Sequence, residues 1–519
     1  MLQNVNRRRI IMKKALSLVL VLLLLTGSTY ALADVQAPFE EPFTFSYLTQ
    51  IWEPYSTETN LISYWEDAMN VKMDIEWAPV DNYSTRVLTA LAGEMPDAIM
   101  LRNVSDVATL IDQGALVPLT DLLDEYCPNL MQYITDEDLA YLYNVGDGEI
   151  YMLPAVTAIP NINTWTIRQD WLDNVGMEIP SDWEGWKSLL RAFRDQDANG
   201  NGDTTDEIPY AGELWPFLYS FGIYASNTNN GISGTSTDSL FCINEAGDYT
   251  LIFEHERYRE YMTEMVEMYK EGLIDPEFAT REETEKRKVM NSNQCGLAFT
   301  QAEQCQLSTD SLRAGGVSDA TWVGIPPIAG PYGDQALFAR SKFGFYTVIT
   351  NEAAENDKVI GILKFFNWMF SEEGAMISNY GIEGMTYDMI DGKPVMYDDV
   401  RADFVSYRNR GMDFQPISHL WLVDAYVQVL TSGIDYEDLP ETRKLFYDAF
   451  YLNDPYFVTS PPILQTEAYI ENANTLLAEA AQLQAQCVAG LITIDEFYDK
   501  YDELKASGLQ DVIDQGREA

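Results

Sequence analysis

A loop of alternating oxygen-bearing residues is the part of this sequence whose side-chain types and spacing best suit chemistry. It lies within FRDQDANGNGDTTDEIPY, residues 193–210. There Asp197, Asn199 and Asn201 alternate with residues that lack a side-chain oxygen, and Gly202 comes directly after them. The same alternation opens an EF-hand loop, because the glycine permits the sharp turn that lets successive oxygens converge on one hard cation. The sequence therefore predicts a structural Ca²⁺ site. Its predicted ligands, with a backbone carbonyl from Asp203 or Thr204 among them, are Asp197, Asn199, Asn201, Asp203, Asp206 and Glu207.

The end of this loop departs from an EF-hand. Counted from Asp197, the position of the bidentate EF-hand glutamate is occupied by Ile208, and the acids Asp206 and Glu207 come before it. An isolated loop of this kind is more often a brace than a switch, so we expect calcium to rigidify the segment. The alternative is a polar turn that is held by its own side chains and binds no metal.

Residues for the common catalytic sites are scarce. Histidine occurs only at His255 and His419, which leaves little material for a zinc hydrolase or a Ser-His-Asp site. His255 lies in EHERYRE, which predicts a solvated helix face. Carboxylate pairs suited to a glycosidase cannot be singled out among 81 acidic residues, and the sequence has no Walker loop or GxGxxG motif. We therefore expect a binding protein and not an enzyme.

The charge balance is strongly acidic. Lys and Arg total 33, Asp and Glu total 81, and the formal net charge is −48. A surface of this sign repels nucleic acid and anionic lipid, so neither is expected as a partner. The length of 519 residues, 46% of them hydrophobic, exceeds one ordinary core and predicts two lobes.

The amino terminus has the three parts of a secretory signal peptide. Positive residues between Arg7 and Lys14 precede the apolar run ALSLVLVLLLL at 15–25, and Ala31 to Ala33 supply a cleavage site of small residues. We therefore expect export, with residues 1–33 removed. The stretch LTGS at 25–28 resembles a lipobox in which Ser28 replaces the obligatory cysteine, so no lipid anchor is expected.

The five cysteines are few and odd in number for an exported chain. At least one thiol must stay free, and a single disulfide between Cys295 and Cys305 remains an open alternative. The sequence has no CxxC motif and no Cys and His spacing that suits a metal.

The residues described above must be positioned by strands and helices, which the sequence predicts in alternation. The stretch FTFSYLTQI at 43–51 predicts a strand, 60–69 a helix, 71–80 a second strand, and 83–101 a helix and a third strand. This order predicts an α/β lobe with a mainly parallel sheet. Strands are predicted again at 296–300 and 342–350, whereas 166–290 is richer in helix. The tail from Thr466 is predicted to be almost entirely helical.

Over nearly the whole mature length, the sequence resembles the family 1 extracellular solute-binding proteins of bacterial ABC transporters. It is most similar to the branch that carries a calcium loop and includes alginate- and other oligosaccharide-binding members. The longest matching stretch runs from IRQDWLDNVG through the calcium loop, residues 167–210. Six further blocks match in the same order: GEMPDAIML (93–101), GALVPLTDLLDEYCPNL (114–130), GDGEIYMLP (146–154), YKEGLIDPEF (269–278), FFNWMFSEEGAMISNYGIEGMTY (365–387) and GLITIDEFYDKYDELKASGL (490–509).

This resemblance implies an α/β fold of the type II periplasmic-binding-protein kind, with two lobes, an interlobe cleft and a helical C-terminal tail. The first lobe would comprise 34–160 and about 338–390. The second would comprise 161–337 and about 391–519, with the calcium loop at 197–207. The family's calcium positions fall on the ligands named above. The loop has one residue more than the usual family pattern between the glycine and the acid pair, so the carbonyl ligand stays open between Asp203 and Thr204.

A sugar-binding cleft needs aromatic platforms for sugar faces and polar groups for hydroxyls. Residues of these types stand where predicted strands end or where the chain crosses between lobes. The predicted ligand-binding residues are Trp52, Glu53, Arg102, Trp165, Arg168, Trp215, Gln301 and Trp421. For Trp52, Trp215 and Trp421 a core position is an equal alternative. A core position is predicted for Trp171, Trp183, Trp186 and Trp368.

The resemblance implies a receptor that delivers a carbohydrate, first of all an oligosaccharide, to the permease of an ABC importer. Lobe closure would accompany binding, because the ligand has a higher affinity for the closed state. A monomer is expected. Two other functions stay open: a secreted polysaccharide-degrading enzyme with a structural calcium, and a receptor for peptides or another small solute on the same scaffold.

Overall fold

The computed structural model describes most of the chain between residues 39 and 518. The described ranges are 39–51, 60–79, 83–101, 104–145, 148–157, 163–226, 240–281, 283–339, 343–402, 420–421, 433–461, 463–464 and 466–518. The predicted signal peptide at 1–33 and His419 lie outside these ranges. Within them, no helix combines the length and the apolar character that a bilayer span requires.

The first lobe is built on a six-stranded sheet with the strand order β15-β4-β12-β3-β1-β2. β12 is antiparallel to both of its neighbours, and the other strand pairs of this sheet are parallel. The strands are β1 (Phe43–Ile51), β2 (Val71–Pro79), β3 (Ala98–Leu101), β4 (Met152–Thr157), β12 (Phe343–Ile349) and β15 (Leu420–Trp421).

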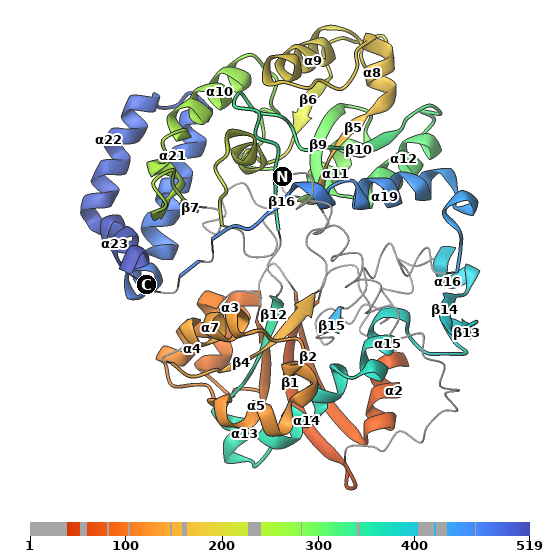
Figure 1. Ribbon diagram of the computed structural model, residues 1–519, viewed down its shortest axis with the longest axis vertical. Coiled ribbons are helices and arrows are strands. Elements are labelled where there is room, and N and C mark those ends of the chain that lie inside the picture. Colours follow the sequence, from red (N-terminus) through yellow and green to blue (C-terminus); the bar gives the residue numbers. More distant parts are fainter. Residues whose placement is uncertain are drawn as a thin grey trace, which may run out of the picture.

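Helices surround this sheet in the lower half of Figure 1. Phe45 and Tyr47 of β1 pack against Phe365 and Phe366 of α14, with ring centroids 5.3 Å and 5.9 Å apart, so aromatic side chains join sheet and helix. The helices are α2 (Asn60–Met69), α3 (Tyr83–Leu91), α4 (Val104–Asp112), α5 (Thr120–Tyr126), α6 (Pro128–Met131), α7 (Asp136–Val145), α13 (Asn351–Glu355), α14 (Val359–Met369) and α15 (Glu372–Tyr380).

The second lobe has a four-stranded sheet with the order β10-β5-β9-β6. Its strands are β5 (Asn163–Arg168), β6 (Ile208–Ala211), β9 (Cys295–Gln301) and β10 (Trp322–Ile325). Its other elements before residue 460 are α8 (Gln169–Val175), α9 (Trp183–Asp195), the 3₁₀ helices η2 (Trp215–Phe221) and η4 (Ile252–Glu254), the hairpin β7 (Phe241–Ile243) and β8 (Tyr249–Leu251), α10 (Tyr258–Lys270), α11 (Glu283–Asn291), α12 (Gln304–Ala314) and α19 (Glu441–Tyr451).

The direction of the strands places particular strand ends near the crossings between the lobes. β4 ends at Thr157 and β5 begins at Asn163, so one crossing joins the carboxyl end of β4 to the amino end of β5. β1 and β3 run parallel to β4, and β9 runs antiparallel to β5. The carboxyl ends of β1, β3, β4 and β9 therefore lie toward the crossings. We call these two sheet margins the interlobe edges.

The lobe boundary differs from the predicted one after residue 390. The hairpin β13 (Tyr387–Ile390) and β14 (Lys393–Met396) leads to α16 (Asp398–Ala402), and Met396 and Val400 pack with Tyr380 of α15. β15 then pairs in parallel with β4. These segments belong with the first lobe, because their packing and strand pairing are with that lobe. In a short parallel pair, β11 (Leu337–Phe338) joins β16 (Phe457–Val458), and β11 lies just before the chain returns to β12 of the first lobe.

The C-terminal tail is helical, as predicted, and flanks the second lobe on the left of Figure 1. It contains α20 (Glu467–Asn472), α21 (Ala478–Val488), α22 (Ile494–Leu504) and α23 (Gln510–Glu518), with the π-helical turns η8 (Ala473–Leu477) and η9 (Lys505–Leu509) between them. A capping box between Thr493 and Glu496 starts α22. α20 also contacts α4, so the tail reaches the first lobe.

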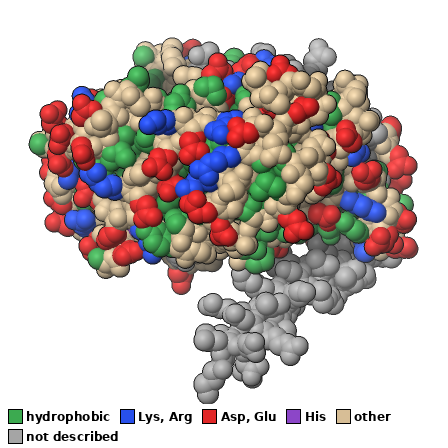
Figure 2. Space-filling view, turned by 90° about the horizontal axis from the view of Figure 1, so that it is seen from above, with side chains coloured by type: hydrophobic (Ala, Val, Ile, Leu, Met, Phe, Trp, Pro, Cys, Tyr) green, Lys and Arg blue, Asp and Glu red, His purple; other side chains and the backbone are tan. Residues whose placement is uncertain are grey.

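The outer face of the second lobe mixes both signs of charge, with acidic side chains in excess (Figure 2). Basic residues of α9 pair with acids there: Lys187 with Glu264 at 2.9 Å, and Arg191 with Glu271 at 2.7 Å. On the face visible in Figure 2, basic side chains therefore lie among acidic ones.

Candidate functional site

The predicted calcium loop follows α9 and leads into β6. The Gly202 N–H donates to Asp197, the Asn201 N–H donates to Oδ1 of Asn199 at 2.9 Å, and the side-chain amides of both asparagines donate to Asp206 at 3.0 Å and 2.9 Å. Gly200 and Gly202 have φ values of 70° and 89°, which a glycine adopts without strain. Two asparagine amides thus converge on the Asp206 carboxylate, and Asp197 holds the turn at Gly202.

Glu207 is the loop residue whose carboxylate is buried in an unfavourable environment. Among the described residues, no hydrogen-bond partner meets either of its carboxylate oxygens, although both are buried. Burial raises the pKa of Glu207, and the nearby carboxylates of Asp206 and Asp197 raise it further, while the backbone N–H groups of Asn199 and Glu207, which face the carboxylate without completing a hydrogen bond, offset part of that rise. A buried anion beside two like charges is unfavourable unless a cation joins them.

Asp203 is turned away from the other loop carboxylates. Its exposed carboxylate accepts hydrogen bonds from the N–H and the hydroxyl of Thr205, at 3.0 Å and 2.6 Å, and these bonds lower its pKa. Within the described part of the chain, no group of three His, Cys, Asp or Glu side chains converges closely enough to hold a metal. The side-chain amides of Asn199 and Asn201 turn their nitrogens, and not their oxygens, toward Asp206.

Two asparagines outside the loop hold its backbone. Asn174 of α8 donates to the carbonyl of Ala198 at 2.9 Å. Asn293, just before β9, donates to the carbonyl of Asn199 at 3.3 Å. Arg168 in turn donates to Oδ1 of Asn293 at 2.8 Å. A chain of hydrogen bonds therefore runs from the end of β5 to the calcium loop.

Arg168 is a core residue, which corrects its predicted place in the ligand cleft. Its side chain has no exposed surface, and its guanidinium pairs with Asp170 through bonds of 2.8 Å and 2.5 Å. The guanidinium also lies over the rings of Trp171 and Trp322, 5.5 Å and 5.8 Å from their centroids. The last residue of β5 lies at the margin far from the crossing, because β5 begins at the crossing.

Trp165 is likewise a core residue and not a cleft platform. Its ring packs against Tyr210, Phe217 and Phe299 at centroid distances of 5.6 Å, 4.9 Å and 5.3 Å, and it has no exposed surface. The prediction rested on its closeness to the crossing. The strand alternation, however, turns Trp165 into the lobe.

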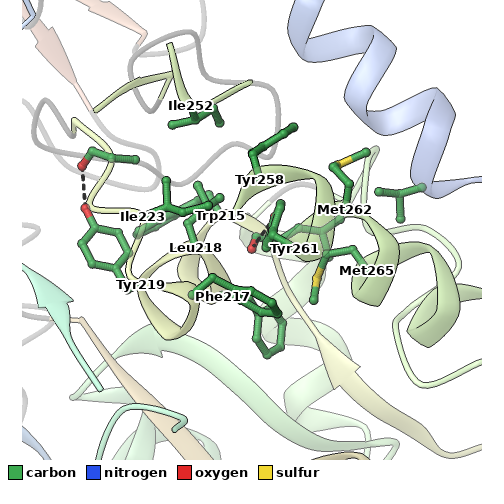
Figure 3. Close-up of a cluster of buried hydrophobic side chains, with 14 of the residues drawn as sticks. Trp215, Phe217, Leu218, Tyr219, Ile223, Ile252, Tyr258, Tyr261, Met262 and Met265 are labelled. Carbon is green, nitrogen blue, oxygen red and sulfur yellow. Dashed lines mark hydrogen bonds between the residues drawn. The ribbon is translucent and has the colours of Figure 1, made fainter. Parts of the chain in front are cut away.

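Trp215 also lies in the core of the second lobe, as Figure 3 shows. It is 8% exposed and packs edge-on against Phe299 and Phe338. Between the two positions that the sequence left open, the structure favours the core. The predicted core positions of three other tryptophans are confirmed, and the fourth is partly buried against the core of the first lobe; these are Trp171, Trp183, Trp186 and Trp368.

Gln301 is the one predicted ligand-binding residue whose described side chain lies at an interlobe edge. It ends β9, is partly exposed, and accepts a hydrogen bond of 2.9 Å from Arg287 of α11. Beside it, the buried ammonium of Lys286 bonds to both carboxylate oxygens of Glu213, at 3.2 Å and 3.3 Å. Sequence analysis missed Arg287, Lys286 and Glu213, because only the fold brings α11 to the end of β9.

Gln50 was missed as well, although it stands near the end of a predicted strand. It is the penultimate residue of β1 and lies at the interlobe edge of the first lobe. Its place near the end of a predicted strand could have indicated a site residue, but a glutamine at such a position is usually an ordinary surface residue. The predicted residues Trp52, Glu53 and Arg102 lie outside the described residues. Trp421 is described only as a backbone position in β15.

Two further expectations need correction. His255 is buried, not solvated: it accepts a hydrogen bond of 3.2 Å from the N–H of Arg257, and burial lowers its pKa. The charged residues around His255 in EHERYRE predicted an exposed helix face. The chain at the end of η4, however, places the His255 side chain in the interior. All five cysteines lie among the described residues as free, buried thiols, so the alternative of a disulfide between Cys295 and Cys305 is wrong.

Comparisons with known proteins extend over most of this architecture. A family model described as bacterial extracellular solute-binding protein matches residues 46–376. The chain is 28% identical over 340 residues to the fructooligosaccharide ABC transporter substrate-binding protein FusA of Streptococcus pneumoniae, a match that covers 61% of this chain and 59% of FusA. It is 22% identical over 508 residues to the polygalacturonan/rhamnogalacturonan-binding protein YtcQ of Bacillus subtilis, covering 95% and 94%.

A third relative, lipoprotein LipO of Bacillus subtilis, is 23% identical over 332 residues, covering 62% of each chain. The matches thus span less than two thirds of the length of FusA and of LipO. Among solved structures, alginate-binding protein AlgQ2 without calcium ion superposes with a TM-score of 0.72 at 22% identity, covering 93% of this chain and 98% of AlgQ2. FusA in complex with kestose gives 0.67 at 20%, covering 92% and 98%, and an EF-hand mutant of FusA gives 0.66 at 19% with the same coverage.

Proposed function

The chain belongs to the bacterial extracellular solute-binding protein family, and we propose that it is a receptor that delivers an oligosaccharide to an ABC importer. The observation that carries this proposal is the likeness in fold over nearly the whole chain to FusA in complex with kestose and to alginate-binding AlgQ2. The named ligands of these relatives, and of YtcQ, are all carbohydrates.

The two interlobe edges are the surfaces between which the ligand would lie. Gln50 lies at one of them and Gln301 at the other, and both side chains can hydrogen-bond to hydroxyls. A ligand that contacts both edges stabilises a closed arrangement over an open one, because only the closed arrangement makes both sets of contacts. The closed monomer would then dock on the permease of the importer.

We propose binding without turnover. The similar proteins are named as binding or substrate-binding proteins. His255, the histidine that the structure describes, is buried and accepts a bond from a backbone N–H, so it is placed for packing and not for proton transfer to a ligand. Export through the predicted signal peptide, with cleavage near Ala33 and no lipid anchor at Ser28, belongs to the same proposal.

A structural calcium ion fits the loop at 197–207. The buried, unpartnered oxygens of Glu207 are the observation that supports this fit, since the loop places an anion there beside Asp197 and Asp206 without balancing it. Calcium would supply the missing positive charge and rigidify the segment between α9 and β6. Asn199 and Asn201 would turn their amide oxygens toward it, and Asp203 would contribute a backbone carbonyl only.

A thermal-shift screen tests the carbohydrate proposal. The mature protein is heated with kestose, nystose, trigalacturonate, an alginate trisaccharide and a tripeptide, each with calcium and with EDTA. We expect at least one saccharide to raise the melting temperature in a saturable way, and we expect EDTA to lower it. A shift with the tripeptide alone would contradict the proposal in favour of a peptide receptor.

Chromatography of the same mixtures after long incubation distinguishes a receptor from an enzyme. The proposal expects the saccharide to be recovered intact. Shortened saccharides in proportion to protein concentration would instead identify a polysaccharide-degrading enzyme with a structural calcium.

A further inference from the structure

Two side chains differ from the other described ones in how many of their buried polar atoms lack a hydrogen-bond partner. Among the described residues, Gln50 and Glu207 are the ones that carry two buried polar atoms with no hydrogen-bond partner; elsewhere such atoms occur one to a residue. Glu207 belongs to the calcium loop, where a cation would satisfy it. Gln50 lies in the other lobe, and its carboxamide needs a different explanation.

Gln50 occupies a central position at the interlobe edge of the first lobe. β1 lies between β2 and β3, with Gln50 opposite Ala78 in the register with β2. β3 ends nearby at the buried Leu101. Small and apolar neighbours on both sides leave the carboxamide without a partner from the sheet. In open α/β sheets, ligands bind in the crevice beyond the carboxyl ends of the parallel strands.

The two polar atoms of the Gln50 carboxamide limit which ligand groups can satisfy it. Oε1 must accept a hydrogen bond and Nε2 must donate, and leaving both unmet in a buried position is unfavourable enough that native proteins rarely retain it without a function. A hydroxyl both donates and accepts, so two adjacent hydroxyls satisfy both atoms at once. A carboxylate accepts from Nε2 but leaves Oε1 unmet.

We propose that Gln50 is a specificity-determining contact that binds two adjacent hydroxyls of a sugar unit. This inference rests on the proposed carbohydrate function and narrows it: the unit beside β1 presents two adjacent free hydroxyls, and not a carboxylate, to Gln50. Gln50 has no exposed surface in the present conformation, so the sugar reaches it when the interlobe edge opens. The unmet carboxamide makes that covered, ligand-free state less favourable than the ligand-bound one.

Isothermal titration of two variants tests this role. Gln50→Leu replaces the carboxamide with an apolar side chain of similar size. The matched control is Thr250→Val, because Thr250 of β8 is also buried, and its hydroxyl lacks a partner among the described residues, but it lies in a hairpin of the second lobe. The probes are kestose, nystose and trigalacturonate, each with calcium.

We expect the wild type to bind kestose or nystose, Gln50→Leu to raise that Kd about tenfold or more, and Thr250→Val to leave it unchanged. We also expect the ligand-free melting temperature of Gln50→Leu to equal or exceed that of the wild type. If the carboxamide had a structural role, the substitution would lower this temperature. An unchanged Kd in Gln50→Leu overturns the inference alone. A wild type that binds none of the probes overturns the proposed function together with it.

Discussion

Oδ1 of Asn293 accepts a hydrogen bond of 2.8 Å from Arg168, while the amide nitrogen of the same side chain donates to the backbone of the calcium loop. Asn293 has a φ of 62°, a conformation that Asn and Asp tolerate better than other side chains do. This single residue therefore couples the buried ion pair of Arg168 and Asp170 to the carbonyl of Asn199. The affinity of the loop for calcium should depend on a residue that is not itself a ligand.

The variant Asn293→Asp tests this coupling. It keeps an oxygen acceptor for Arg168 and removes the donor to Asn199, so we expect calcium affinity to fall by about threefold to tenfold, or roughly 1 kcal/mol. Calcium titration followed by melting temperature measures it. The matched control is Asn70→Asp, since Asn70 also has a positive φ of 54° and also donates to a backbone carbonyl, at Phe39 of the first lobe. Equal effects of both variants on calcium affinity would contradict the coupling.

Removal of the Glu207 charge should abolish the response to calcium. In Glu207→Gln we expect no calcium-dependent rise in melting temperature, whereas saturating the wild type a hundredfold above its Kd should add about 2.7 kcal/mol. Asp203→Asn should behave like the wild type, because the Asp203 carboxylate is exposed and bonds to Thr205. A lost response in Asp203→Asn would show that this side chain binds the ion.

Without calcium, the same Glu207→Gln variant should be at least as stable as the wild type near neutral pH. The substitution removes a buried negative charge from beside Asp206 and Asp197, and the neutral amide is less costly to bury. Urea unfolding in EDTA measures this difference. A marked loss of stability would indicate that the carboxylate makes stabilising contacts of its own.

His255 should make the protein sensitive to mild acid. Burial lowers its pKa; Arg257 lowers it further, and Glu256 and Glu245 oppose the shift. A histidine with a lowered pKa contributes stability above its unfolded pKa, and that stability is lost as pH falls through the folded pKa. Protonation of Nδ1 would also break its bond from the Arg257 N–H.

The comparison uses urea midpoints of the wild type and of His255→Gln at pH 7.5 and pH 5.5. We expect the wild type to lose more stability than the variant between these pH values. Parallel losses in the two proteins would assign the acid sensitivity to other groups.

The five thiols should be inert in the folded protein. Burial raises the pKa of four of them to about 12 and of Cys487 to about 11, so the reactive thiolate is rare. Ellman's reagent should detect almost no thiol in the native protein and all five after denaturation, and a reductant should leave the melting temperature unchanged. A count of three under denaturing, non-reducing conditions would reveal a disulfide.

Periodic patterns predicted the secondary structure well. The strand at 43–51, the helix at 60–69 and the helical tail were all confirmed, because alternation and helical repeats are local properties that the packing of each element requires. The two-lobed fold followed from the order of these elements and from the resemblance. Neither required a knowledge of which side chains meet.

The site was harder to predict because closeness to a crossing does not determine direction. Trp165 and Arg168 stand near the crossing in sequence, yet one faces the core and the other lies at the far end of its strand. His255 shows the same limit, since its charged neighbours lie on the other side of a short helical turn. Gln50 could be noticed only once the hydrogen-bond partners of every buried amide were known.

The place of β12 in the first sheet has a consequence for biosynthesis. β12 lies between β3 and β4, yet it begins 191 residues after β4 begins, since the two strands start at Met152 and Phe343. The nascent amino-terminal segment therefore cannot close its own sheet, because a central strand is missing. This topology delays completion of the first sheet until β12 has been synthesised. The late strand thus makes completion of the first lobe depend on two distant parts of the chain.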